Sequence, residues 1–499
     1  MFRKVLIANR GEIAVRIART LQQMGIAAVA VYSEPDRGSP HVSACDEAYP
    51  LEGKTSGETY LQGARIIEIA KSHGVDAIHP GFGFLSENAA FAKAVAGAGL
   101  TFIGPKPEVI RAMGDKISAK KAFAAAGVPV VPGWSGSMDE APSSIAREAD
   151  RIGYPVLIKA AAGGGGKGMR AVASPVELSS AIESAQREAA AAFGDGRVFM
   201  EKLIERPRHV EIQILGDHHG NVVHLFEREC SIQRRHQKIV EESPSPALTP
   251  ELRERMGSAA VTAAKAAGYT NAGTVEFMVD PRGAFYFLEV NTRLQVEHPV
   301  TEMVTRLDLV ELQIRIAAGE RLPFTQTELR QDGHALEVRI YAEDASRGFL
   351  PSIGKIAAYA RPRGPNIRVD DGVREGSEVS VYYDPMLAKL IVWGRSREES
   401  IRRMIWALDR YVVLGVTTNI EFLRNLLQHA EFRAGRIHTG FLSEHTIAAE
   451  SRQAVPDEVL IAAALAASNP AGAMTASGAA PSDTDRLGPW SLAHAWRVA

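Results

Sequence analysis

The stretch TVEFMVDPRGAFYFLEVN (274–291) alternates apolar and polar residues on both sides of a turn signal, and this pattern predicts a β-hairpin. A turn centred between Pro281 and Arg282 sets Glu276 opposite Phe287, with Glu289 diagonal to it. We expect the more apolar face to be core. The strand period of two puts Thr274, Glu276, Met278, Phe285, Phe287, Glu289 and Asn291 on one face, and Val275, Phe277, Val279, Tyr286, Leu288 and Val290 on the other.

Two acids and an amide therefore converge on one face of the predicted hairpin. Like charges repel at that distance unless a cation lies between them, and hard oxygen ligands suit Mg²⁺, which bridges carboxylates and substrate phosphates. The pattern thus predicts a metal site at Glu276, Glu289 and Asn291. The alternative is a solvated outer face with unrelated acids, and the expected position of Phe285 and Phe287 on the same face argues against it.

The sequence contains two further segments that are rich in polar residues. Arg293, Gln295 and Glu297 alternate directly after it, which would put a cation, an amide and a carboxylate on one side of an extended strand. Residues 230–238 (CSIQRRHQK) form a second polar run that includes Lys238. For that run alone, a basic surface patch is the commoner explanation.

Residues 162–168 (AGGGGKG) lie between two predicted strands, PVLIKA (155–160) and MRAVA (169–173). The run fails the Walker A pattern, because Lys167 is followed by Gly168, and a dinucleotide site would need a helix after it. A glycine-rich tip between strands predicts a mobile flap that closes over a triphosphate, with Lys159 and Lys116 neutralising phosphate charge. A surface turn and solvated lysines are the simpler alternatives.

The first 110 residues alternate strands and helices, which predicts a doubly wound parallel sheet. Strands are expected at 4–8, 27–32, 75–78 and 102–103, and helices after residue 13 and at 60–72. Residues 335–437 mix short strands with a helix at 397–408, whereas residues 468–485 have the composition of a flexible linker.

The composition describes an ordinary globular chain. The 499 residues suggest about three domains. Lys and Arg total 57 and Asp and Glu total 59, a net charge of −2, which argues against a chain-wide nucleic-acid binder. Cys45 and Cys230 form neither a disulfide framework nor a zinc spacing. No targeting or membrane segment is visible, so we expect a cytoplasmic protein.

Several motifs together resemble those of biotin carboxylases, either the free bacterial subunit or the first part of an acyl-CoA or pyruvate carboxylase. The resemblance covers roughly residues 1–445, and HPGFGFLSEN and RLQVEH are hardly shared with other ATP-grasp enzymes. The matching segments are IANRGEIAVRI (7–17), HPGFGFLSEN (79–88), IGPKPEVIRAMGDK (103–116), KAAAGGGGKGM (159–169), ERECSIQRRHQKIVEESPS (227–245), GTVEF (273–277), FLEVNTRLQVEHPVTE (287–302) and YYDPMLAKLI (382–391).

The resemblance implies an α/β protein in four parts. Residues 1–115 would form a Rossmann-like domain, and residues 116–330 an ATP-grasp domain with a glycine-rich lid at about 131–203. Residues 334–445 would form a C-terminal mixed α+β domain. Residues 446–499 would be a linker and the start of a further domain, because GPWSLAHAWRVA (488–499) resembles the middle domain of acyl-CoA carboxylase α chains, especially the methylcrotonyl-CoA type.

The resemblance also implies an activity. ATP phosphorylates bicarbonate to carboxyphosphate, which breaks down to CO₂ and phosphate, and CO₂ then joins N1′ of biotin. Three groups of residues match family positions. The nucleotide site would contain Lys116, Lys159, Gly164, Gly165, Gly166, Glu201, Lys202, Ile204, His209, Gln233 and His236; the Mg²⁺ or Mn²⁺ site Glu276, Glu289 and Asn291; and the bicarbonate pocket Lys238, Arg293, Gln295, Val296 and Glu297.

The implied catalytic roles are specific. Glu297 would be the general base on bicarbonate, and Arg293 would orient its oxygens. Arg339 would stabilise negative charge on the biotin ureido oxygen, with Asp384 positioning Arg339. Two positions depart from the usual family pattern: Phe82 stands where Tyr is frequent, and Lys167 where Arg is common. The first removes a hydroxyl, and the second keeps the charge but loses bidentate phosphate contact.

The resemblance implies partners as well. A biotin-attachment motif is missing, since Met474 is followed by Thr475. Biotin is therefore expected on a separate carrier protein or domain, or the chain is a fragment of a longer one. A carboxyltransferase subunit and a homodimer or larger hetero-oligomer are expected, with Arg16 at a family interface position. Neither nucleic acid nor membrane is expected as a partner.

Three alternative functions fit parts of the sequence less well. Another ATP-grasp ligase is opposed by the segment containing Arg293 and Glu297 and by HPGFGFLSEN. A nicotinamide-dependent oxidoreductase is opposed by NRGE (9–12), which stands in the place of G-x-G-x-x-G. A non-catalytic nucleotide-binding regulator is opposed by the complete set of Glu276, Glu289, Arg293, Glu297 and Arg339.

Overall fold

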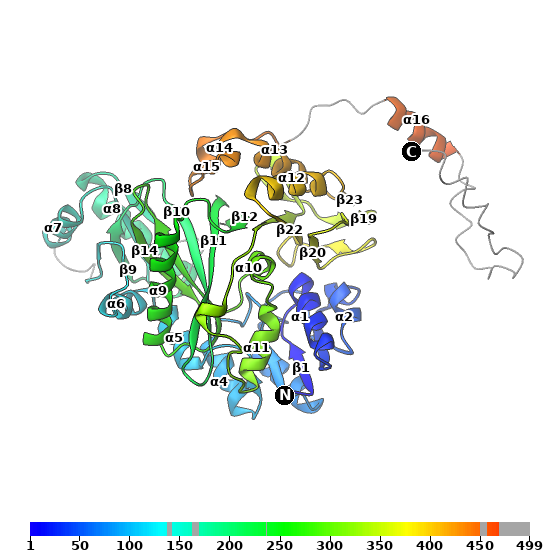
Figure 1. Ribbon diagram of the computed structural model, residues 1–499, viewed down its shortest axis with the longest axis horizontal. Helices are drawn as coiled ribbons and strands as arrows, with labels where there is room; N and C mark the ends of the chain where they lie inside the picture. Colours follow the sequence, from blue (N-terminus) through cyan, green and yellow to red (C-terminus); the bar gives the residue numbers. More distant parts are fainter. Residues whose placement is uncertain (137–141, 162–168, 236, 450–456, 469–499) are drawn as a thin grey trace, which may run out of the picture. The chain divides into compact units, whose positions relative to one another are not determined.

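The computed structural model describes residues 1–136, 142–161, 169–235, 237–449 and 457–468 (Figure 1). Residues Met1–Glu450 form one compact unit and Ser451–Ala499 a second. In the second unit the described part is helix α16 (Asp457–Ser468). The linker prediction for 468–485 lies almost wholly outside the described residues.

The N-terminal segment folds as the predicted parallel sheet. Its strand order is β3-β2-β1-β4-β5, and all pairs are parallel. Alternate residues of β1 enter different cores, since Val5 and Ile7 pack with helix α1 and Leu6 with the opposite face. The sheet is therefore doubly wound, as expected. The elements are β1 (Lys4–Ile7), α1 (Gly11–Gln23), β2 (Ala27–Tyr32), η1 (Glu34–Asp36), α2 (Pro40–Ala44), β3 (Glu47–Pro50), α3 (Gly63–Ser72), β4 (Ala77–His79), α4 (Ala89–Gly97), β5 (Thr101–Phe102) and α5 (Pro107–Gly114).

A four-stranded sheet of order β6-β9-β7-β8 follows. β7 and β8 pair antiparallel, as expected for the two strands that flank the glycine run, but the run itself lies outside the described residues. Helices α7 and α8 cover this sheet with a small apolar core. The elements are α6 (Lys116–Ala125), β6 (Gly133–Trp134), α7 (Pro142–Ile152), β7 (Val156–Ala160), β8 (Arg170–Val172), η2 (Pro175–Glu177), α8 (Leu178–Phe193) and β9 (Val198–Lys202).

The largest sheet has the order β14-β13-β10-β11-β12-β15-β22-β20, with antiparallel neighbours throughout. Because β12 pairs with β15, the central and C-terminal segments share one continuous sheet. Helix α9 packs along β10 and β11 (Figure 1). The elements are β10 (Arg208–Gly216), β11 (Val222–Arg234), β12 (Gln237–Ser243), α9 (Pro250–Ala266), β13 (Asn271–Val279), β14 (Phe285–Asn291), α10 (His298–Thr305), α11 (Leu309–Ala317), η3 (Gln326–Glu328), β15 (His334–Tyr341), β20 (Ile367–Asp371) and β22 (Met386–Gly394).

The C-terminal segment adds short two-stranded sheets and helices around one apolar core. The helix predicted at 397–408 is present. Among the described residues, none of the helices combines the length and apolar character that crossing a bilayer requires. The remaining elements are β16 (Glu343–Asp344), η4 (Ala345–Arg347), β17 (Leu350–Pro351), β18 (Gly354–Lys355), β19 (Ala358–Ala360), β21 (Glu378–Val379), α12 (Arg397–Leu408), β23 (Val412–Leu414), α13 (Ile420–Gln428), α14 (Ala430–Arg433) and α15 (Phe441–Glu444).

Candidate active site

One cavity of about 680 Å³ gathers most of the predicted site residues. Its walls come from the four-stranded sheet, from strands β10 to β15 of the large sheet and from the segment after β14. Predicted residues Gly164, Gly165, Gly166 and His236 lie outside the described residues. The predicted residues that line the cavity are Lys116, Lys159, Glu201, Lys202, Ile204, His209, Gln233, Lys238, Glu276, Glu289, Asn291, Arg293, Gln295, Val296, Glu297 and Arg339.

The β13–β14 hairpin exists, but the predicted register was wrong. Glu276 lies directly opposite Glu289, and the register shifts between Glu276 and Phe277, so that Leu288 is the extra residue of a β-bulge. Because of the bulge, the residues of β14 before Leu288 lie on the face opposite to the predicted one. Phe285 and Phe287 are therefore core residues packed with Phe277, and not neighbours of the acids. Met278 and Leu288 take the expected place of the aromatic rings beside the carboxylates in the cavity wall.

The segment after the hairpin is not the extended strand that the alternation predicted. β14 ends at Asn291, and residues 292–297 form an irregular connection to α10, whose N-cap is Glu297. Arg293, Gln295 and Glu297 nevertheless all line the cavity. Folding back of the chain, and not strand alternation, brings these side chains together.

Lys238 lines the cavity and contacts three carboxylates. Its Nζ donates to Glu211 Oε2 at 2.6 Å, to Glu297 Oε1 at 2.7 Å and to Glu276 Oε1 at 2.9 Å. Burial lowers the pKa of this ammonium group, but the three carboxylates outweigh burial and raise the pKa well above its ordinary value. Lys238 therefore stays charged and can attract an anion to the carboxylates around it.

Glu297 lies between two cations. Its second oxygen accepts from Arg339 Nη2 at 2.9 Å, while Arg339 Nε donates to Glu241 Oε1 at 2.7 Å. Burial raises the pKa of Glu297, but the charges of Lys238, Arg339 and Arg228 bring that pKa below its ordinary value. The carboxylate is thus ionised and fully buried, in reach of whatever binds between Lys238 and Arg339.

Arg293 lines the same cavity and donates to three neighbouring side chains. Its Nε donates to Glu87 Oε2 at 2.9 Å, its Nη1 to Gln295 Oε1 at 2.7 Å and its Nη2 to Asn291 Oδ1 at 3.2 Å. Glu87 also accepts from the backbone of Thr292 at 3.0 Å, which fixes the start of the irregular segment. The guanidinium group is therefore held in a defined plane beside Lys238 and Glu297.

The predicted metal ligands lie together, and lysine side chains pair with the two acids. Glu276 accepts from Lys238 and from Asn291 Nδ2 at 2.8 Å, and Glu289 Oε2 lies 2.9 Å from Lys116 Nζ. Opposed carboxylates with an adjacent amide form an oxygen-rich set that fits Mg²⁺. The residue set therefore suits the expected ion, with lysines neutralising the acids here.

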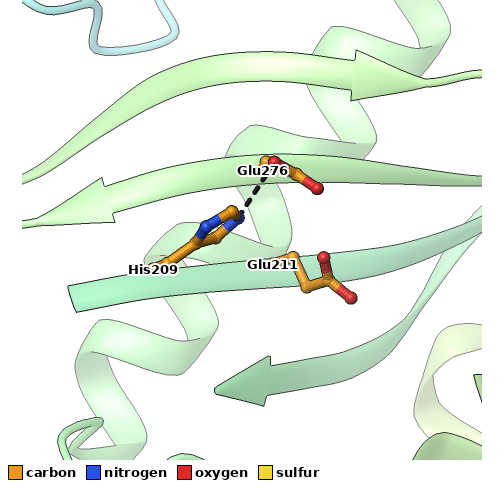
Figure 2. Close-up of side chains that lie close together, drawn as sticks. All are labelled: His209, Glu211 and Glu276. Atoms are coloured by element: carbon orange, nitrogen blue, oxygen red, sulfur yellow. Dashed lines mark ion pairs between the residues drawn. The ribbon is translucent and has the colours of Figure 1, made fainter. Parts of the chain in front are cut away.

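A second acidic group overlaps this set. His209, Glu211 and Glu276 bring ligand atoms within 4.8 Å of one another. Figure 2 shows His209 and Glu211 on one strand and Glu276 on its neighbour, with His209 Nε2 2.9 Å from Glu276 Oε2. Gln233 Nε2 lies 2.7 Å from the other ring nitrogen of His209. Glu276 thus links the predicted metal residues to His209 and Gln233.

At the opposite end, Glu201 on β9 is shared by two lysines. Lys120 Nζ lies 2.5 Å from one carboxylate oxygen and Lys159 Nζ 3.2 Å from the other. Lys202 donates to the carbonyl groups of Gly153 and Tyr154 at 3.0 and 2.8 Å. Its side chain therefore anchors the connection between α7 and β7. This end of the cavity is rich in cations, which suits phosphate groups.

Sequence reasoning missed Glu211 and the residues that fix it. Glu211 lies opposite Glu276 on the neighbouring strand and accepts from Lys238 and Arg228. Arg228 is fully buried and also donates to Gln213 Oε1 at 2.7 Å. The available signal was the alternation of His209, Glu211 and Gln213 on an otherwise apolar strand.

A second cavity, of about 590 Å³, adjoins the first, and the two share the lining residues Arg293, Val296, Arg339, Tyr341 and Asp384. Phe82 and Asp384 line it. The expectation that Asp384 positions Arg339 is not met, because Arg339 is held by Glu241 and Glu297, while Asp384 accepts from the backbone of Met386 at 2.9 Å. Arg339, on strand β15 of the large sheet, lines both cavities.

Arg16, the expected interface residue, is bound within the chain. Its Nη2 lies 2.8 Å from both Glu302 Oε1 and Asp308 Oδ1, and the residue is only 4% exposed. Both cysteines, Cys45 and Cys230, are free, as their spacing predicted.

Comparisons with known proteins identify the family of the chain. Three family models match the chain: "Biotin carboxylase, N-terminal domain" over residues 1–110, "Carbamoyl-phosphate synthase L chain, ATP binding domain" over 115–325 and "Biotin carboxylase C-terminal domain" over 337–444. The chain is 54% identical to the methylcrotonoyl-CoA carboxylase α subunit of Dictyostelium discoideum over 89% of its own length, but it spans only 63% of that relative.

Shorter relatives match nearly end to end. The biotin carboxylase of Halalkalibacterium halodurans is 53% identical, with 89% of this chain and 98% of the relative covered. The biotin carboxylase domain of Hydrogenobacter thermophilus 2-oxoglutarate carboxylase, solved as a dimer with MgADP, ADP and bicarbonate, has a TM-score of 0.86 at 50% identity. That match covers 89% of this chain and 98% of the solved one. The chain therefore belongs to the biotin carboxylase family.

Proposed function

We propose that the chain carboxylates biotin in a reaction that consumes ATP and bicarbonate and passes through carboxyphosphate. The observation that carries the proposal is the position of Glu297, buried and ionised between Lys238 and Arg339. This arrangement offers a base for bicarbonate, a cation for its charge and a second cation facing an adjoining cavity. The similarity to biotin carboxylases supports the same reaction.

In the first step, bicarbonate would bind beside Lys238 and Arg293. Its hydroxyl proton moves to Glu297 while a bicarbonate oxygen attacks the γ-phosphorus of ATP, and ADP leaves. A carboxylate with a lowered pKa stays ionised until the substrate arrives. When the bicarbonate anion shares Lys238, the stabilisation of ionised Glu297 falls and its basicity rises.

The nucleotide would occupy the cation-rich end. Lys116, Lys159 and the predicted residues Gly164 to Gly166 would surround its phosphates, with Glu201, Lys202 and Ile204 at the hinge and His209, Gln233 and His236 along the nucleotide. Closing the lid would exclude water from labile carboxyphosphate. Glu276, Glu289 and Asn291 would hold Mg²⁺ or Mn²⁺, which when bound supplies positive charge to the phosphate oxygens.

In the second step, carboxyphosphate breaks down to CO₂ and phosphate. The phosphate takes the proton from N1′ of biotin, and N1′ then attacks CO₂. Arg339 would donate to the ureido oxygen while it carries negative charge, and Gln295 and Val296 would complete the wall of the bicarbonate pocket. The position of Arg339 between both cavities supports this role.

The wider setting is part of the same proposal. Biotin would arrive on a carrier protein or domain, and a carboxyltransferase subunit would use the carboxylated biotin, as the first half-reaction of an acyl-CoA carboxylase. The methylcrotonoyl-CoA carboxylase relatives, of which the chain spans about three fifths, support this setting. A homodimer or larger hetero-oligomer in the cytoplasm and the four-part division at residues 115, 330 and 445 complete the proposal.

The test is phosphate release from Mg-ATP, measured with and without bicarbonate and with and without free biotin. We expect release that requires bicarbonate, rises with biotin and collapses in Glu297→Gln. Turnover that ignores biotin would contradict the proposed substrate. ATP binding without any turnover would contradict the proposed catalysis.

A further inference from the structure

The second cavity lies where the N-terminal sheet changes direction. The strand order β3-β2-β1-β4-β5 reverses between β1 and β4, and the cavity is lined by the residues that follow these two strands, including Arg10 and Phe82. Ligands of doubly wound sheets bind at the carboxyl ends of the strands at such a reversal. The N-terminal segment therefore builds one side of this cavity, which is the place for biotin if Arg339 donates to the ureido oxygen as proposed.

The opposite wall is a connection between β21 and β22. Val381, Tyr382 and Asp384 line the cavity, and Val381 is 70% exposed. An exposed connection of this kind needs an anchor to keep a fixed position. Tyr383, in its middle, is that anchor, because its Oη donates to the carbonyl of Lys54 at 2.6 Å.

Arg10 holds the ring of Tyr383 from the N-terminal side. The guanidinium carbon lies 4.3 Å from the centre of that ring, a distance at which a cation and an aromatic face attract each other. Arg10 stands immediately before α1, which packs against β20 in the large sheet (Figure 1). The contact thus joins the two walls of the cavity.

Asp36 fixes the plane of Arg10. Its two oxygens accept from Arg10 Nη2 and Nε, both at 2.7 Å, and Tyr60 Oη donates to Asp36 at 2.6 Å. Asp36 is buried, which raises its pKa, but Arg10 and His41 lower that pKa to about 2. The pair is therefore charged at neutral pH, and a bidentate guanidinium keeps one orientation.

We propose that Asp36 and Arg10 form a positioning pair for the biotin cavity: they hold Tyr383 and so fix the wall that carries Val381, Tyr382 and Asp384. This inference rests on the proposed function. Asp36 does not line the cavity, so its effect passes through Arg10 and Tyr383. The pair lies apart from the nucleotide residues, so it should govern the response to biotin and leave ATP binding unchanged.

The test measures phosphate release from Mg-ATP and bicarbonate against free biotin concentration, with the full chain. We expect Asp36→Asn and Arg10→Met to raise the KM for biotin about tenfold, the size expected for losing one partly shielded cation–aromatic contact. In Asp36→Asn, whose side chain does not line the cavity, the biotin-independent rate and the KM for ATP should stay within about twofold. Arg65→Met, on an exposed part of α3, is the control and should change neither constant.

Two further variants distinguish loss of the contact between Arg10 and Tyr383 from misfolding. Arg10→Lys keeps the charge but loses the bidentate geometry, and should raise the KM for biotin less than Arg10→Met does. Arg10→Met in a Tyr383→Leu background should add little, because both changes remove the same contact. An unchanged KM for biotin in folded Arg10→Met, or fully additive effects, would overturn this inference alone. A wild-type chain that ignores biotin would overturn the proposed function and this inference with it.

Discussion

Glu241 and Glu242 are neighbours on β12, yet their environments differ sharply. Glu241 lies on the side of Arg339, a residue of the cavity wall, and burial and the charge of Glu297 raise the pKa of Glu241 to about 7 despite Arg339. Glu242 faces away, and although burial raises its pKa, Arg397 and His334 lower it to about 2. Both residues are almost fully buried, so solvent exposure does not explain the difference.

The partners explain it. Arg397 bonds both oxygens of Glu242 at 2.6 and 3.0 Å, and His334 Nε2 lies 2.8 Å from the same carboxylate. By contrast, Glu241 and Glu297 share one guanidinium group. Glu242 thus has a guanidinium group of its own, whereas Glu241 shares Arg339 with Glu297, so that the charge of Glu241 is only partly compensated.

The largest effect should come from Lys238→Met, which removes the cation shared by three carboxylates. We expect bicarbonate-dependent phosphate release to fall about 10²–10³-fold, as when one preorganised charge contact is removed from a catalytic site. Steady-state phosphate assays would measure this loss. The control Lys355→Met removes an exposed lysine and should leave the rate unchanged. A rate in Lys238→Met within threefold of wild type would contradict this role of Lys238.

Arg339→Met should separate the two half-reactions. We expect biotin-stimulated turnover to fall about 10²-fold, because the ureido oxygen loses its donor. Phosphate release without biotin should fall less, since Glu297 retains Lys238. Comparing both rates in the same preparation is the measurement, and equal losses in the two would show that Arg339 does not act on biotin.

These expectations indicate which parts of the site could be predicted from sequence. Residue types and periodicity located the parallel sheet, the strands around the glycine run and the acidic hairpin. They could not locate the bulge at Leu288, because one extra residue reverses side-chain faces without changing the composition of the strand.

Contacts between distant segments were equally hidden. Glu87 and Arg293 are 206 positions apart, and Glu241 and Arg339 are 98 apart. Periodicity within one strand does not show which strands become neighbours, so Glu211 and Glu241 were passed over. The resemblance alone implied that Asp384 positions Arg339. In the structure Glu297 binds Arg339, and Asp384 accepts from the backbone of Met386.

Glu242→Gln, which removes the charge paired with Arg397, should lower the free energy of unfolding without changing the rate of phosphate release. Because the pKa of Glu242 is lowered to about 2, the ionised carboxylate stabilises the fold by about 3 kcal/mol at pH 7. This contribution is present above the unfolded pKa near 4.5 and is lost as the pH falls towards 2. Urea unfolding at pH 7 and pH 4 should show a smaller difference between variant and wild type at the lower pH. An equal difference at both would refute the ion pair.

Glu241→Gln should change stability with the opposite pH dependence, and its effect should be smallest near pH 4, where this carboxyl group is largely protonated in both the folded and the unfolded state. The folded pKa of Glu241 is raised, so wild type loses stability as the pH rises from about 4.5 to about 7, whereas the variant does not. The same urea titration, performed between pH 4 and pH 8, should find the variant close to wild type at the low end and relatively more stable at the high end. Relative destabilisation of the variant at pH 8 would mean that Glu241 is ionised and fully paired.

The central claim is that a bicarbonate oxygen attacks ATP in the pocket between Lys238, Glu297 and Arg293. ¹⁸O-labelled bicarbonate tests it directly, with mass spectrometry of the phosphate released before bicarbonate exchanges oxygen with water. The account predicts one ¹⁸O atom in each phosphate formed. Phosphate that carries only oxygen from ATP and water would contradict it, because water would then be the nucleophile.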